Sequence, residues 1–268
     1  MISPPVWMLK RPGILLPVFF LSLFPGPMKG QNMVPESTTA ALGGTFVTRS
    51  SFMAASQNQA GLGWTEHHSL GLQHSRPFME LGISALAARA KTRKGSLGSV
   101  LSSCGIRGLR HTSLWISYGM KLSPQLSAGL GMQVQSFSIP GQAFYHPELD
   151  LAFGIQLRIS DRWELGTHIS SENSRQDLCI SAGCAYSFFQ SATLYAECHI
   201  RTGQRIQFSQ GLEWAFANRL SLMLGISNLP VTWSAGLRVL HKQWGIHLAF
   251  QYVSVNGSIP YTSLHYAW

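Results

Sequence analysis

The chain has 268 residues, of which 45% are apolar, 26 are glycine and only 12% are charged. Soluble globular proteins carry about twice that density of charge, so much of this surface is expected to face something other than water. The composition also excludes a disordered or collagen-like chain. After residue 30 no run of about 18 apolar residues occurs, which excludes a helical membrane protein and leaves a closed β-barrel as the spanning structure.

Residues 1–30 have the features of a secretory signal peptide. Lys10 and Arg11 precede an apolar run over residues 13–24, and a Pro-Gly-Pro breaker follows before the small residue Gly30. This order of basic, apolar and small residues is typical of a cleaved leader. The sequence therefore predicts an exported chain with cleavage near Gly30.

From about residue 67 onward, apolar residues alternate with small or polar ones, which is the period of a two-faced strand. The clearest segment places Leu149, Leu151, Phe153, Ile155, Leu157 and Ile159 on one face, and Asp150, Ala152, Gly154, Gln156 and Arg158 on the other. Across these segments the second face is mostly Gly, Ser, Ala and Gln, with few charges. Such a face is typical of a crowded barrel interior rather than a surface in water.

Fourteen alternating segments are predicted, at 67–75, 79–90, 96–106, 112–122, 125–137, 148–159, 162–170, 178–188, 192–201, 205–216, 219–227, 230–240, 243–253 and 260–268. The first and third alternate least clearly, which leaves twelve strands open. The predicted fold is all-β: a transmembrane antiparallel up-and-down barrel over residues 66–268. Residues 31–65 are expected to form a plug-like segment in or under the lumen.

The connections between segments predict the orientation of the barrel. Short connections near Pro124, Asp161, Asn218 and Lys242 alternate with longer ones over 138–147, 171–177 and 254–259. Outer-membrane barrels have short periplasmic turns and longer outside loops, so both termini are predicted to be periplasmic.

Aromatic residues sort by strand direction in this arrangement, as the aromatic girdles of outer-membrane barrels do. The periplasmic rim is predicted to hold Trp163, Tyr186, Phe188, Trp214, Phe216, Trp244, Tyr266 and Trp268. The opposite rim is predicted to hold Phe208, Trp233, Tyr252 and Tyr261.

The last residues, Leu264, Tyr266 and Trp268, alternate up to a terminal aromatic. This ending resembles the C-terminal signal of bacterial outer-membrane proteins. The resemblance implies recognition by the barrel-assembly machinery and a location in the bacterial outer membrane.

A second resemblance lies upstream of the strands. Gly43 and Gly44, followed by Asn58, Ala60, Gly61 and Leu62, resemble the N-terminal pattern of the PorV/PorQ and FadL-like barrels, with Gln59 in place of the proline of that pattern. The family implies fourteen strands with the N-terminal segment inside the lumen. PorV and PorQ relatives are non-enzymatic parts of type IX secretion in Bacteroidota, whereas FadL relatives pass hydrophobic molecules across the outer membrane.

The main functional expectation is therefore an accessory or scaffold subunit of an outer-membrane secretion or assembly complex, and the alternative is FadL-like passive transport of hydrophobic small molecules. The expected partners are outer-membrane lipids, the assembly machinery and other outer-membrane proteins. No cofactor is expected.

Several charged and histidine side chains are predicted to point into the lumen. They are Arg158, Glu164, His168, Glu197, His199, Arg201, Glu213 and Arg238. Buried charges require partners. The set predicts either a polar conduit or binding site, or a salt-bridge network that fills the barrel beside the plug.

Other chemistry has weak support in the sequence. Serines are plentiful and His168 or His265 is available as a base, but no motif selects a nucleophile, so no enzyme is expected and a lipid-modifying activity stays a third possibility. His67 and His68 point to opposite faces of a strand and predict no metal site. The four cysteines contain no C-x-x-C pair and are interpreted as small apolar residues, with a bridge left open.

Nucleic-acid binding is not expected despite the formal charge of +9. Basic residues cluster only over 89–94, without the interleaved aromatics of a nucleic-acid surface. A solvated turn or contact with lipid phosphates explains this cluster better.

Overall fold

The structure is a computed structural model that describes residues 35–77, 81–106, 109–138, 147–172, 177–188, 191–254 and 257–268. The predicted signal peptide, residues 1–30, lies outside these ranges, as do the first residues of the predicted plug, 31–34.

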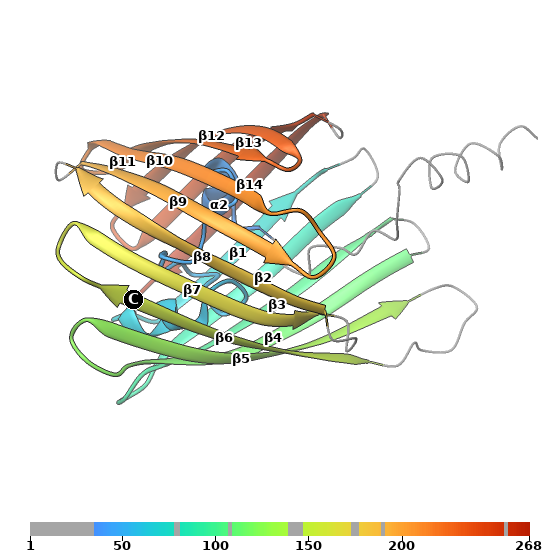
Figure 1. Ribbon diagram of the computed structural model, residues 1–268, viewed down its shortest axis with the longest axis horizontal. Helices are drawn as coiled ribbons and strands as arrows, with labels where there is room; N and C mark the ends of the chain where they lie inside the picture. The colour runs from blue at the N-terminus through green and yellow to red at the C-terminus, as the bar shows by residue number, and fades with distance from the viewer. Residues whose placement is uncertain are drawn as a thin grey trace, which may run out of the picture. The chain divides into compact units, whose positions relative to one another are not determined.

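Fourteen strands form one closed antiparallel barrel (Figure 1). They are β1 (Ser69–Ser75), β2 (Gly82–Lys91), β3 (Ser96–Ile106), β4 (Leu109–Lys121), β5 (Leu126–Ser138), β6 (Glu148–Arg158), β7 (Trp163–Glu172), β8 (Asp177–Phe188), β9 (Ala192–Arg201), β10 (Gln207–Ala217), β11 (Leu220–Asn228), β12 (Val231–His241), β13 (Trp244–Val253) and β14 (Gly257–Ala267). The predicted fold is confirmed. The count is fourteen, because both of the weakest predicted segments are strands, β1 and β3.

The barrel closes where the first strand meets the last. β1 pairs with β14 from Ser69 opposite Ala267 to Ser75 opposite Tyr261. Just before β1, His68 and Trp268 exchange two backbone hydrogen bonds of 3.0 Å. This pairing joins the two edge strands, so the described sheet has no free edge, as a membrane-spanning sheet requires.

The outer surface of the barrel is apolar on every strand. Its exposed side chains include Leu72, Leu86, Leu101, Leu114, Leu130, Leu151, Leu165, Leu194, Leu224, Leu248, Phe250 and Leu264 along the middle of the wall. Inward positions are occupied instead by serine, glutamine, glycine and alanine. A closed barrel with this polarity is built for lipid outside and a filled, polar interior. Among the described residues no helix has the length and hydrophobicity to cross a membrane.

Aromatic rings line the short-turn rim as predicted. Trp163 lies 4.6 Å from Tyr186, and Trp244 lies 4.7 Å from Tyr266, between ring centroids on neighbouring strands. At the other rim Trp233 and Tyr252 face each other across β12 and β13. Tyr261 was predicted there as well, but it points into the lumen, where its hydroxyl donates to Gln251 Oε1 at 2.9 Å. Tyr261 shares the inward parity of Ser263, so the alternation of β14 excludes it from the lipid face.

The outward position of Leu248, in the middle of β13, gives a test of this wall. Leu248→Arg is expected to lower the free energy of unfolding in lipid vesicles by about 2–4 kcal/mol, because a cation at the bilayer midplane is poorly solvated. Gln204→Arg, in the exposed connection between β9 and β10, is the matched control and should change it little. Urea unfolding measures both, and equal effects would contradict the lipid-facing register.

Candidate functional site: the filled lumen

The lumen is filled by the chain segment that precedes β1, residues 35–65, which we call the plug. It contains a short helix, α2 (Ser37–Ala41), and a 3-10 helix, η1 (Gln59–Trp64), and nearly all of its side chains are buried. α2 lies against β11–β14, whereas η1 lies against β3–β6, so the intervening chain crosses the barrel (Figure 1). The plug is irregular, and its buried backbone groups therefore need partners from the wall.

The Gly-Gly motif marks where the plug turns after α2. Gly43 has φ of +72° and Gly44 has φ of +97°, a region that side-chain-bearing residues rarely adopt. A Cβ at Gly43 would also lie 2.7 Å from the backbone nitrogen and oxygen of Ile226. The motif therefore has two physical causes: backbone conformation and close approach to β11.

Asn58 organises the second half of the motif. Its side chain caps η1 by accepting from Ala60 N at 3.1 Å, and it donates to the carbonyl oxygens of Val47 and Thr167. A Cβ at Gly154 would lie 1.9 Å from Asn58 Oδ1, so only glycine on β6 admits this cap. Leu62, at the end of the motif, is fully buried in an apolar cluster with Val100.

Glu197 holds the crossing chain. Its Oε1 accepts hydrogen bonds from the backbone nitrogens of Phe46 at 2.7 Å and Val47 at 2.8 Å. From β6, Gln156 Nε2 donates to the carbonyl of Val47 at 2.8 Å and to that of Arg49 at 3.1 Å. One carboxylate and one amide thus satisfy the backbone where the plug has no secondary structure.

Two phenylalanines of the plug are each packed between two histidines of the wall. Phe46 stacks on His199 and meets the edge of His168, both at 5.6 Å between ring centroids. Phe52 stacks on His265 at 5.3 Å and lies 6.3 Å from His247. These contacts fix the plug at two points on nearly opposite sides of the barrel.

A charged cluster lies beside the first of these points. Arg238 forms a salt bridge with Glu213, which also accepts from the Tyr195 hydroxyl at 3.3 Å. The guanidinium of Arg49 lies 5.8 Å from the centroid of the Tyr195 ring. Burial by itself would lower the pKa of Arg49, but neighbouring acidic groups, Tyr195 and Glu213 first among them, outweigh it and raise the pKa. Arg49 therefore stays a cation inside the lumen.

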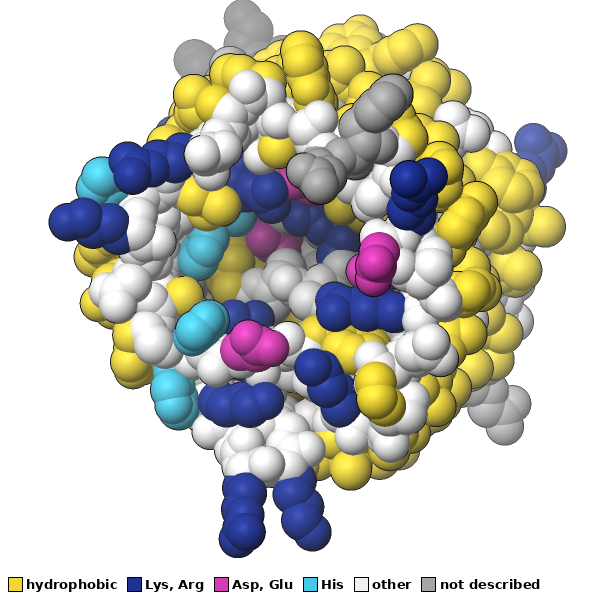
Figure 2. Space-filling view, turned by 90° about the vertical axis from the view of Figure 1, so that its left-hand side faces the viewer, with side chains coloured by type: hydrophobic (Ala, Val, Ile, Leu, Met, Phe, Trp, Pro, Cys, Tyr) yellow, Lys and Arg dark blue, Asp and Glu magenta, His cyan; other side chains and the backbone are white. Residues whose placement is uncertain are grey.

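The plug ends at the short-turn mouth of the barrel. There Trp64 lies under the guanidinium of Arg158, 4.1 Å from the ring centroid, and under Lys121 Nζ at 5.1 Å. Arg158 also pairs with Glu164 at 3.2 Å. Figure 2 looks onto the end of the barrel where the C-terminus lies in Figure 1, and it shows Lys and Arg side chains gathered around a hollow.

Seven of the eight polar residues predicted to point inward fall into three groups. Glu197, His199 and His168 surround Phe46; Glu213 and Arg238 form the charged cluster; Arg158 and Glu164 lie at the mouth. Arg201 lies beyond His199, at the loop end of β9. The arrangement is closer to the network that fills a barrel than to one conduit.

The sequence did not reveal several plug-side members of these groups: Glu36, Phe46, Arg49, Phe52 and Trp64. Glu36 lies 3.7 Å from His247, between carboxylate and ring nitrogen. Their wall partners Tyr195, His247 and His265 could have been found from strand parity. The plug residues carry no such signal, because an irregular segment has no period.

Within the described ranges, no three His, Cys, Asp or Glu side chains come together as a metal site. His67 and His68 are exposed, and His68 stacks on Trp268. No disulfide joins any two of the four cysteines, all of which lie within the described residues.

The fold and its polarity define a class: a transmembrane β-barrel of the bacterial outer membrane, with a filled lumen. No protein-family model matches the chain, and no curated protein sequence matches it. Among solved structures, the toluene transporter TbuX of Ralstonia pickettii is similar at 11% identity and a TM-score of 0.63, over 87% of this chain and 97% of that one. The CymD monoaromatic hydrocarbon channel is similar at 11% identity and a TM-score of 0.66, over 87% of this chain and 96% of that one. The toluene transporter TodX of Pseudomonas putida is similar at 12% identity and a TM-score of 0.64, over 87% of this chain and 96% of that one.

These similarities establish the shared fold. The strands and their connections, residues 69–268, make up about three quarters of the chain. A match over 87% therefore extends into residues before β1. The comparisons support the FadL-like fold, and they give no support to PorV or PorQ specifically.

Glu197 offers a direct test of how the plug is held. Glu197→Ala leaves two buried amides without an acceptor, each costing about 1–3 kcal/mol. We expect the amides of Phe46 and Val47 to exchange hydrogen at least tenfold faster, and Glu197→Gln, which keeps one acceptor oxygen, to have a smaller effect.

The control is Glu164→Ala, whose partner Arg158 is partly exposed at the mouth. It should leave those two amides unchanged. Hydrogen exchange read by mass spectrometry distinguishes the variants, and equal protection in Glu197→Ala and the native chain would show that the carboxylate does not anchor the plug.

Proposed function

We propose that this barrel is a non-enzymatic channel for the passive passage of small hydrophobic molecules across the outer membrane. The observation that carries the proposal is the architecture itself: a fourteen-stranded barrel, its lumen filled by the segment before β1, that matches hydrocarbon channels over nearly their full length. Transport of toluene or monoaromatic hydrocarbons is what those proteins are named for. Passive transport of hydrophobic small molecules, which was the alternative expectation from the sequence, thus becomes the main one.

The interior supports this proposal because apolar surface lies between plug and wall. One cluster joins Phe52, Met53 and Leu62 of the plug to Val100 and Trp115 of the wall. A second joins Leu42 to Met223, Val253 and Ile259. A small hydrocarbon that displaces part of the plug finds apolar side chains on both surfaces, and burial there is favourable by about 25 cal/mol per Å².

None of the three solved structures named above is a secretion protein, so the type IX expectation stays a prediction. Association with other outer-membrane proteins likewise stays a prediction.

The channel proposal predicts faster entry of toluene into cells. Expression in a host that lacks hydrocarbon transporters should raise the initial rate of labelled toluene uptake severalfold at low external concentration, because the lipopolysaccharide leaflet is then bypassed. Uptake of arabinose, a polar solute of similar size, should change little, since the plug fills the lumen.

The comparison strain carries the empty expression vector, and the folded level of the native barrel in the outer membrane of the test strain is measured first. Equal rates of toluene entry in the two strains would contradict the proposal. If native-size analysis of the gently extracted protein then showed a stoichiometric assembly with other outer-membrane proteins, the secretion prediction would take its place.

A further inference from the structure

The outer face of β1–β4 carries three chemically distinct rows near its loop ends. The row nearest the loops is Arg76, Gly82, Gly105 and Arg110; the next is His74, Ser84, Ser103 and Thr112; the third is Leu72, Leu86, Leu101 and Leu114. In the second row and in the third row, the residues of neighbouring strands lie directly opposite one another from β1 to β4. Gly82 is opposite Gly105, which is opposite Arg110, and Arg76 follows the last residue of β1.

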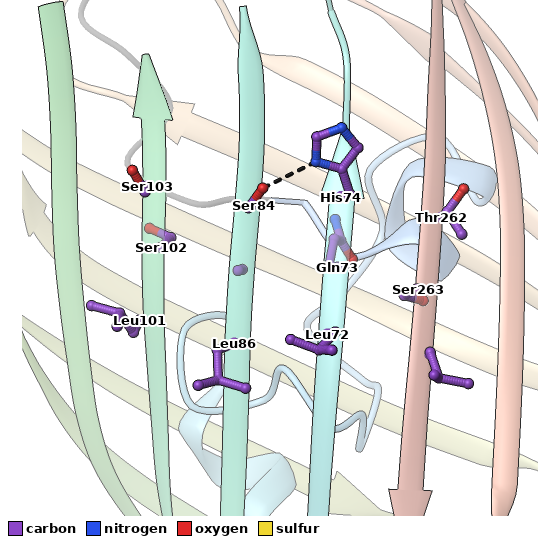
Figure 3. A pocket seen from close by; sticks show the side chains of 12 residues that line it. Leu72, Gln73, His74, Ser84, Leu86, Leu101, Ser102, Ser103, Thr262 and Ser263 are labelled. Carbon is purple, nitrogen blue, oxygen red and sulfur yellow. Dashed lines mark hydrogen bonds between the residues drawn. The ribbon is translucent and has the colours of Figure 1, made fainter.

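A hollow of about 480 Å³ lies along the second and third rows on β1–β3 and extends to Thr262 and Leu264 of β14, with the arginine row beyond its loop-side end. Figure 3 shows Leu72, Leu86 and Leu101 at one level and His74 and Ser84 at the next, with Ser103 and Thr262 on either side. His74 Nδ1 lies 3.0 Å from Ser84 Oγ. His74, Ser84 and Thr262 are exposed on the surface that the rest of the wall gives to lipid.

The upper row leaves room between two cations. A Cβ at Gly82 would have its nearest heavy atom, His74 Cε1, 3.7 Å away, so the space above β2 is open. Three strand spacings separate Arg76 from Arg110, which is about 14 Å. Both arginines are exposed, and among the described residues neither has an ion-pair partner.

The order of the rows, from cations through hydrogen-bonding groups to leucines, follows the order of groups in an anionic lipid. Arginine binds phosphate oxygens through paired N–H donors. Hydroxyl and imidazole groups suit the ester and hydroxyl oxygens just below the phosphate, and leucines suit acyl chains. Outward polar groups in a barrel wall are costly beside hydrocarbon, so a row of them calls for a polar partner.

We propose that this three-row surface binds a phosphate-bearing lipid of the outer leaflet. Its phosphate lies between Arg76 and Arg110, its interfacial oxygens meet the His74 to Thr112 row, and its chains lie on the leucines. A pure hydrocarbon has no polar group that could bind the arginines. A second copy of the chain related by a twofold axis would bring like charges together, since the described residues of the patch include no carboxylate.

This inference does not depend on the proposed channel. Lipid retention can be measured on the purified protein with no transport readout, so the two proposals fail separately.

The test titrates lipid A into the full-length protein, delipidated and held in a neutral detergent, and follows binding by native mass spectrometry. We expect one lipid A to be retained, with diacylglycerol, which lacks the phosphate, binding at least tenfold more weakly. Arg76→Gln combined with Arg110→Gln should weaken lipid A binding about tenfold or more. Gly82→Leu, which fills the open space without removing charge, should weaken it as well.

The matched control combines Arg162→Gln with Arg219→Gln, two exposed arginines at the short-turn end. It removes the same charge and should leave lipid A binding within twofold of the native value. Equal losses in the two double variants would overturn the site in favour of general charge attraction. Equal binding of diacylglycerol, or a dimer that disappears with Gly82→Leu, would overturn it too.

Discussion

The structure depends on one constraint: a closed barrel of fourteen strands leaves an interior too wide for its own side chains to fill, and an irregular chain segment fills it. Every buried amide and carbonyl of that segment must find a partner, because an unpaired one costs as much as a lost hydrogen bond. The wall supplies those partners from its inward positions. Ser117 and Ser127 donate to the carbonyls of Ala55 and Ala60, both at 2.6 Å, and Ser234 donates to Ala41 O at 2.9 Å. The inward positions of the wall are thus rich in serine, glutamine and glycine because the plug must be hydrogen-bonded and closely packed there.

The same constraint explains how far the sequence could predict the fold. A strand with lipid on one side and a packed interior on the other must alternate, so residues 149–159 and their counterparts reveal both the strands and their register. The inward direction of Glu197, His199 and Glu213 followed from that parity alone. Tyr261 shows the limit: an aromatic near a strand end suggests a rim position, but parity decides the face, and parity places it inside.

The path of the plug could not be predicted in this way. Gly43, Gly44 and Asn58 carried a family resemblance, and the structure gives physical reasons for them, in positive φ angles and in a helix cap. Phe46, Phe52 and Arg49 carried none, because their roles depend on which wall residues they meet across the lumen. Their partners His199 and His265 are separated from them by more than 150 residues of sequence. No local pattern encodes a contact of that kind.

The plug is not held equally along its length, and this bears on how a channel could open. Both ends are fixed by apolar clusters, around Leu42 on one side and around Met53 and Leu62 on the other. Separating either cluster would expose apolar side chains to water. The crossing chain between them is held by hydrogen bonds to Glu197 and Gln156 and by the packing of one side chain, Phe46, on His199 and His168. Water can replace those hydrogen bonds at a small net cost once the segment is displaced. Under the channel proposal, a hydrophobic solute would displace the crossing chain, residues 44–51, and pass along the apolar side chains at the edges of the two clusters, while α2 and η1 stay in place.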